Sequence, residues 1–196
     1  MDFVASLPAP LISRSKQFLS IWHGWRRGRL LPERQDIDFG QLGDLVGTCL
    51  LLHVRGHDDI RVDWVGETIT DLLGYDLTGM NYLDLTTPEN RAWRAHLTMA
   101  QMAQPCSVVI YYMLQLAQGG VMPVEFVSGP LREDGTAGNA SLILCCASGL
   151  TGLHQGQGKA VNPDSYEEGE GMRFIDIGAG VPPMVPSVRQ DARLVQ

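Results

Sequence analysis

Two segments late in the chain read as β-strands that are apolar on both faces. In residues 106–116, CSVVIYYMLQL, successive side chains would point to opposite sides of a sheet, and apolar residues occupy both sides. Residues 140–148, ASLILCCAS, repeat this pattern. A sheet with one face in water alternates apolar and polar residues instead. We therefore expect both faces of this sheet to be covered, which restricts the fold to a sheet packed between other elements.

A helix predicted for residues 13–29 supplies a cover for the outer face of that sheet. Its large apolar residues follow a 3.6-residue period, at relative positions i, i+3, i+4 and i+7. These residues are Phe18, Ile21, Trp22 and Trp25. We expect the helix to lie across the sheet of its own chain or of a partner's. Because an uncovered apolar patch of this size is unusual on a monomer, a homodimer formed at this face is expected.

The order of the predicted elements gives the fold class. Helical segments are expected between the second and third strands, one ending at the C-cap Gly74 and one running from Thr87-Pro88 through Gln104. Strand-like runs bounded by turn signals occupy residues 49–54, 60–65, 106–116, 121–127 and 140–148. This order predicts an α+β fold, a five-stranded antiparallel sheet with helices on one face and the N-terminal helix covering the other.

The chain divides into three parts by composition. Residues 1–46 form an N-terminal helical extension and residues 47–150 the strand-rich domain. Residues 151–196 open with a Gly- and charge-rich stretch and are predicted to be a mostly disordered tail. Within this tail only MRFIDIGAGVPPMVP has apolar content, and docking of this segment on the domain or on a partner is an open alternative.

Charge and apolar content exclude several classes of protein. The net charge is −7, so no nucleic-acid partner is expected. No apolar run approaches the roughly 20 residues of a membrane span, so no membrane insertion is expected. The four cysteines have no disulfide-like or metal-ligand spacing. They indicate a reducing, cytoplasmic location and no metal site.

Several motifs resemble one family. The stretch LLGYDLTGMNYLDLTTPENR (72–91), with its GYDLTG box, resembles the sensory PAS domains. Together with IWHGWRRGRLLPERQDID (21–38) and IRVDWVGETITDLLGYDLTG (60–79), it resembles a bacterial group of compact single-domain PAS proteins of largely unassigned function. The resemblance covers roughly residues 17–150 and implies a stand-alone sensor or interaction module. The flavin photoadduct chemistry of some PAS relatives is not expected, because no cysteine lies within residues 67–104.

The interior between sheet and helices is the candidate ligand pocket. Its expected lining combines adaptable thioethers with aromatic rings, which suits a small apolar ligand. The candidates are Trp64, Met99, Met102, Tyr112, Leu114 and Phe126. The alternative is that these side chains fill the core completely. His96 lies on the helix 88–104, where haem-binding PAS sensors carry a ligand, so a haem site is an alternative, although no cofactor is expected.

These observations together predict a non-enzymatic cytoplasmic PAS-type signalling module that acts through protein–protein contacts and that a small ligand could gate. A cofactor-binding sensor built on His96 or on the Trp64 pocket is one alternative. A small α+β enzyme is another, because fold alone does not determine function. No nucleophile, base and orienting group lie in plausible association, which disfavours the enzyme.

Overall fold

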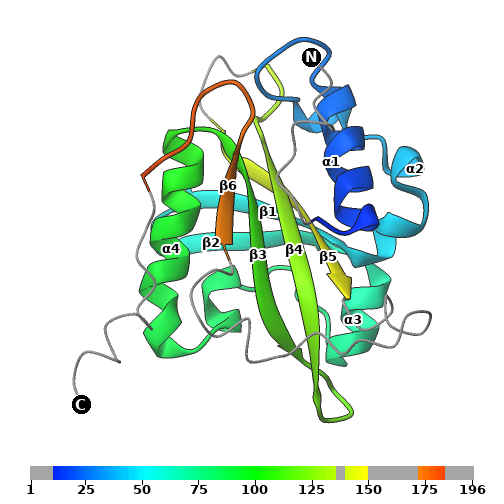
Figure 1. Cartoon of the computed structure of the whole chain (residues 1–196). Helices are drawn as coiled ribbons and strands as arrows, with labels where there is room; N and C mark the ends of the chain where they lie inside the picture. The colour runs from blue at the N-terminus through cyan, green and yellow to red at the C-terminus, as the bar shows by residue number, and fades with distance from the viewer. Residues whose placement is uncertain (1–10, 136–139, 150–171, 184–196) are drawn as a thin grey trace.

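Six antiparallel strands form one sheet in the computed structural model, which describes residues 11–135, 140–149 and 172–183 (Figure 1). Their order across the sheet is β2-β1-β5-β4-β3-β6. The strands are β1 (Cys49–Gly56), β2 (Asp59–Val65), β3 (Cys106–Gln115), β4 (Val121–Leu131), β5 (Leu142–Gly149) and β6 (Met172–Asp176). The predicted α+β class and antiparallel sheet are confirmed.

The expected strand count of five was too low, because β6 adds an edge strand next to β3. This strand lies within the region predicted as a mostly disordered tail. Met172 and Phe174 of β6 share a face and pack with Leu97 and Trp93, so a short apolar segment becomes buried on an existing edge without a core of its own. Residues 150–171 and 184–196 lie outside the described residues.

The helices lie on both sides of the sheet. The α-helices are α1 (Ser13–Trp25), α2 (Phe39–Leu42), α3 (Glu67–Leu73) and α4 (Pro88–Ala103). Short 3-10 turns are η2 (Arg34–Asp36), η3 (Gly43–Thr48) and η4 (Tyr82–Leu85). None of the helices in the described part of the chain is long and apolar enough to cross a membrane.

Neighbouring residues of β4 show which helix covers which face. Gln101 of α4 donates a hydrogen bond of 3.0 Å to the Ser128 hydroxyl, whereas Trp22 of α1 packs against Gly129. Because successive residues of a strand point to opposite faces, α4 and α1 cover opposite sides of the sheet, as Figure 1 shows on either side of β3 and β4. We call the α4 side the inner face and the α1 side the outer face.

The expectation that the N-terminal helix covers the outer face is confirmed, and the cover comes from the same chain. α1 packs on β4 and β5, with Phe18, Trp22 and Trp25 buried and Ile21 half-buried. The α-helix ends at Trp25, earlier than the predicted 29. The reason is local: Arg27 and Gly28 adopt positive φ values of 49° and 83°, which no right-handed helix accommodates.

The segment after α1 is joined to the end of β4. The backbone N–H of Arg34 donates to the carbonyl of Arg132 at 3.0 Å, and the Arg132 N–H donates to the Pro32 carbonyl at 3.1 Å. Buried Glu33 pairs with the Arg132 guanidinium, and buried Asp36 pairs with that of Arg29. This joint holds the segment from residue 34 to α2 over β1 and β2, where the candidate site lies.

Candidate functional site

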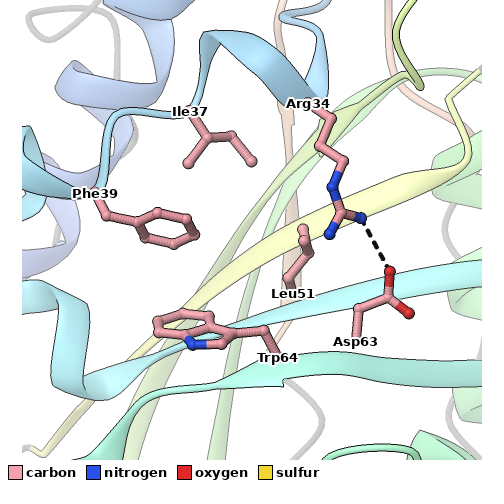
Figure 2. A pocket seen from close by; sticks show the side chains of 6 residues that line it. All are labelled: Arg34, Ile37, Phe39, Leu51, Asp63 and Trp64. Carbon is pink, nitrogen blue, oxygen red and sulfur yellow. Dashed lines mark hydrogen bonds and ion pairs between the residues drawn. The ribbon is translucent and has the colours of Figure 1, made fainter.

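A pocket of about 300 Å³ lies on the outer face, between the η2–α2 segment and strands β1 and β2 (Figure 2). Figure 2 shows its six lining side chains directed toward one another across an open space. They are Arg34, Ile37, Phe39, Leu51, Asp63 and Trp64. The pocket lies over β1 and β2, beside the area of β4 and β5 that α1 covers.

A β-bulge directs Trp64 into this pocket. In the β1–β2 pairing, Leu51 faces Trp64 and Leu52 faces Val62, so Asp63 is an extra residue on β2. The extra residue reverses the alternation of side chains along the strand. As a result, Asp63 and Trp64 both line the outer pocket, whereas Val62 points to the inner face.

The apolar side of the pocket is built from two aromatic rings. The Phe39 and Trp64 ring centroids are 4.8 Å apart, with the ring planes tilted by 54°. Phe39 is the first residue of α2, and Asp38 caps that helix by accepting a hydrogen bond from the Gly40 N–H at 2.9 Å. Phe39 is 40% exposed, which is high for a phenylalanine. The rings therefore offer an accessible apolar surface.

The opposite side of the pocket is charged. The Arg34 guanidinium donates to the Asp63 carboxylate at 3.0 Å. His53 lies between two carboxylates, with Nδ1 3.7 Å from Asp63 and Nε2 3.5 Å from Glu133. This arrangement suits binding: it can hold an apolar group against the two rings and a polar group beside the ion pair.

The residues predicted to line an inner pocket do not all meet. Tyr112 and Phe126 contact edge to face, with ring centroids 5.8 Å apart, and buried Met102 belongs to the same inner core. Met99 and Leu114 are half-buried, and Leu114 shares the face of Tyr112. Trp64 lies on the other side of the sheet, because of the bulge at Asp63.

The inner core contains a polar cluster beside Tyr112. The Arg94 guanidinium lies 4.6 Å from the centre of the Tyr82 ring. Burial raises the pKa of Tyr82 and of Tyr112. On the same face of the sheet, three residues of β1 and β2 are almost fully buried: Leu50, Leu52 and Val62.

The predicted haem ligand His96 has an exposed side chain on α4, whereas its neighbours Ala95 and Leu97 are buried. A group bound between α4 and the sheet would therefore not meet this imidazole. Among the described residues, no three histidine, cysteine or carboxylate side chains gather in a way that could hold a metal ion.

The residues predicted as a lid or dimer interface are occupied within the chain. Trp22 lies against Gly129, and the Trp25 indole N–H donates to the Gln41 side-chain oxygen at 2.9 Å. Sequence reasoning did not single out the outer pocket, because the bulge that turns Trp64 outward depends on strand register. The one local sequence feature that pointed to the outer pocket was the aromatic residue Phe39 directly after the helix cap Asp38.

The solved structures that are similar to this chain are distant from it in both sequence and structure. One solved chain is an RNA-binding light-oxygen-voltage receptor, with 19% identity, a TM-score of 0.43, and coverage of 60% of this chain and 34% of that one. This chain thus spans about a third of that receptor. Another is the light state of the Aureochrome1 LOV photoreceptor, with 14% identity, a TM-score of 0.43, and coverage of 62% and 86%. A third is the LOV protein of Rhodobacter sphaeroides, with 12% identity, a TM-score of 0.42, and coverage of 67% and 73%.

The search of curated proteins found no match. The family comparison is decisive instead: a sequence model described as the PAS domain matches residues 12–146, which is more than half of the chain. The matched range begins before α1 and ends within β5. The resemblance inferred from the GYDLTG box is confirmed, and this chain belongs to the PAS domain family.

Proposed function

We propose that this PAS domain is a non-enzymatic, cytoplasmic signalling module that works by binding a partner protein through the outer pocket. The observation that carries the proposal is the pair of accessible rings, Phe39 and Trp64, on a face that the chain's own helix covers elsewhere. Tryptophan and arginine, here Trp64 and Arg34, are among the residues that most often dominate binding energy at protein interfaces. Four free, buried cysteines fit a reducing compartment.

The size of the pocket favours a side chain of a partner over a large cofactor. About 300 Å³ is at the lower limit of the volumes that hold small molecules. An apolar or aromatic residue of a partner would fill it, with a polar group beside Arg34 and Asp63. A small ligand would gate this contact only if it bound one arrangement of the η2–α2 segment more tightly than another.

Homodimerisation stays a prediction, and the structure changes how it should be tested. Because α1 covers the outer face of its own chain, a dimer does not have to bury that surface. Sedimentation equilibrium of the full chain beside a Phe39→Ala variant tests whether a second copy uses the pocket. A dimer that dissociates in the variant would identify a second copy as the occupant.

The binding proposal is tested by affinity capture from the native cell with the full chain as bait. Phe39→Ala and Trp64→Ala should each lower retention of the bound partner by about tenfold or more, since each removes a central aromatic anchor. Tyr75→Ala is the matched control, because Tyr75 is 49% exposed and belongs to the loop after α3, away from the pocket. Circular dichroism verifies that all variants fold.

Equal retention by wild type and both pocket variants would contradict the proposal. Native mass spectrometry of the purified chain, compared with denaturing mass spectrometry, addresses the ligand alternative. Added mass that disappears on denaturation would favour a small-molecule sensor. Turnover of such a molecule would favour the enzyme.

A further inference from the structure

Cys49 of β1 and Cys146 of β5 lie directly opposite each other in neighbouring antiparallel strands. We call them the thiol pair. Both side chains are fully buried, and both lie on the outer face beneath η3 and α1. Neither the spacing nor the composition of the sequence indicated this pairing, since it depends on the register between two strands far apart in the chain.

The backbone hydrogen bonds between β1 and β5 show whether the thiol pair occupies a hydrogen-bonded or a non-hydrogen-bonded position. In the same register, the Val54 N–H donates to the Ser141 carbonyl at 2.8 Å, so these two residues form a hydrogen-bonded pair. Hydrogen-bonded and non-hydrogen-bonded pairs alternate along an antiparallel ladder. Cys49 lies an odd number of residues from Val54 and is therefore in a non-hydrogen-bonded pair. Its carbonyl accepts a hydrogen bond of 2.8 Å from Gly66 on the other side, as this assignment requires.

A non-hydrogen-bonded pair has the spacing that a disulfide needs. Such pairs hold their Cα atoms about 4.5 Å apart, with the side chains close together on one face. Disulfides span Cα separations of roughly 4.4 to 6.8 Å. Cys145 points to the inner face, and Cys106 lies on β3, so neither of them has this relationship with Cys49.

The surroundings of the thiol pair favour ionisation of one member. Cys49 Sγ donates a hydrogen bond of 3.2 Å to the Leu45 carbonyl. Cys146 Sγ lies 3.6 Å from Thr48 Oγ1 and 3.9 Å from Ser148 Oγ. The neighbouring Cys49, and then Thr48 and Ser148, lower the pKa of Cys146 to about 7 against the opposing effect of burial. The neighbouring Cys146 and burial raise the pKa of Cys49.

We propose that the thiol pair is an oxidative modification site, at which a peroxide converts Cys49 and Cys146 into a cross-strand disulfide. The Cys146 thiolate attacks one peroxide oxygen, the O–O bond breaks, and the leaving hydroxide takes up the thiol proton as water. Cys49 then attacks the sulfenic sulfur of Cys146, the S–O bond breaks, and a second water leaves with the Cys49 proton. Two thiols are oxidised by two electrons, and one hydrogen peroxide is reduced to two waters.

The modification would change the contact that links the thiol pair to η3. The reduced Cys49 thiol donates to the Leu45 carbonyl, and the disulfide has no proton to donate. The oxidised chain therefore loses one hydrogen bond that fixes η3, the turn that joins α2 to β1. Thr48, the last residue of η3, is half-buried, and its hydroxyl lies 3.6 Å from Cys146 Sγ.

The experiment treats the folded, reduced full chain with hydrogen peroxide, blocks remaining thiols after unfolding, and maps disulfides by peptide mass spectrometry without reduction. The expected product is one intramolecular Cys49–Cys146 crosslink that dithiothreitol reverses. The double variant Cys106→Ala with Cys145→Ala should form the same crosslink, because its thiol pair is intact. In Cys49→Ala, a Cys146 sulfenic acid should accumulate and be trapped by dimedone.

A disulfide through Cys145 or Cys106, or a disulfide between two chains, would overturn the proposal. Oxidation of Cys146 beyond sulfenic acid in the wild-type chain without a crosslink would overturn it as well. If Cys49→Ala does not fold, the double variant still decides the question, because failure of its two remaining cysteines to crosslink contradicts the proposal directly.

Discussion

The Glu125 carboxylate accepts a hydrogen bond of 3.2 Å from the backbone N–H of Ile12, a residue 113 positions earlier in the chain. Ile12 is the residue that precedes α1, and Glu125 is fully buried in β4 beneath that helix. The contact places a carboxylate at the N-terminus of α1, where the helix dipole favours negative charge. Glu125 therefore fixes where α1 begins on the outer face.

Replacement of Glu125 by alanine should lower the free energy of unfolding by about 1–3 kcal/mol, because the Ile12 N–H loses its partner in a partly buried environment. Glu125→Gln keeps an acceptor oxygen in the same place and should cost less. Urea denaturation followed by circular dichroism measures both. An alanine variant as stable as the wild type would show that the contact contributes nothing to the packing of α1.

Gly129 allows Trp22 to lie close to β4. A Cβ atom at Gly129 would come within 2.5 Å of the Trp22 indole nitrogen. Gly129→Ala should therefore destabilise the protein by about 1–3 kcal/mol, as overpacking does in a dense core. Gly24→Ala is the control within α1, because no atom lies within 4 Å of its added Cβ. That change should be stabilising by about 0.5–1 kcal/mol, since alanine favours the helix. Thermal unfolding checks the packing: the midpoint temperature should fall in Gly129→Ala and rise in Gly24→Ala.

The ion pairs of the joint between α1 and β4 make stability depend on pH. The hydrogen bond from Gln35, followed by that from Arg132, lowers the pKa of Glu33 below its ordinary value. A carboxyl whose pKa is lower in the folded state stabilises the fold above its unfolded pKa of about 4.3 and loses that contribution as the pH falls through the folded pKa. The urea concentration at the midpoint of unfolding should therefore decrease once the pH drops below about 4.3. In Glu33→Gln this fall should be smaller, and an identical pH profile would contradict the assignment.

Oxidation of the thiol pair should accelerate through neutral pH. Since the pKa of Cys146 is lowered to about 7, the thiolate fraction rises between pH 6 and pH 8, where an ordinary thiol with a pKa of about 8.5 is still mostly protonated. Acid quenching at timed intervals, followed by mass spectrometry of the crosslinked peptide, gives the rate. A rate that rises only above pH 8 would show that Cys146 is an ordinary thiol.

Local pattern was enough to predict the layers of this fold. The apolar character of both faces of residues 106–116 required a cover, and the aromatic stripe at Phe18, Trp22 and Trp25 could supply one. Both features depend on periodicity within a single element. Gly74 likewise ends α3 with a φ of 78°, as its position after the helical segment predicted.

Features that depend on register between strands could not be predicted in this way. Strict alternation along IRVDWV would place Trp64 on the same face of the sheet as Ile60 and Val62. The extra residue Asp63 moves Trp64 to the opposite face. The thiol pair and the β6 edge strand depend on pairing between segments far apart in the chain. These contacts have no local signature, because their residue types are ordinary apolar strand residues.

The position of β6 has a practical consequence for anyone who prepares fragments of this protein. The family match ends at residue 146, so a fragment designed to that limit would shorten β5 and would lack β6. The N–H and C=O groups along one side of β3, which pair with residues 172–176 in the full chain, would then have no ladder partner there. Exposed strand edges of that kind recruit other chains, so such a fragment should aggregate for a reason unrelated to the stability of its core.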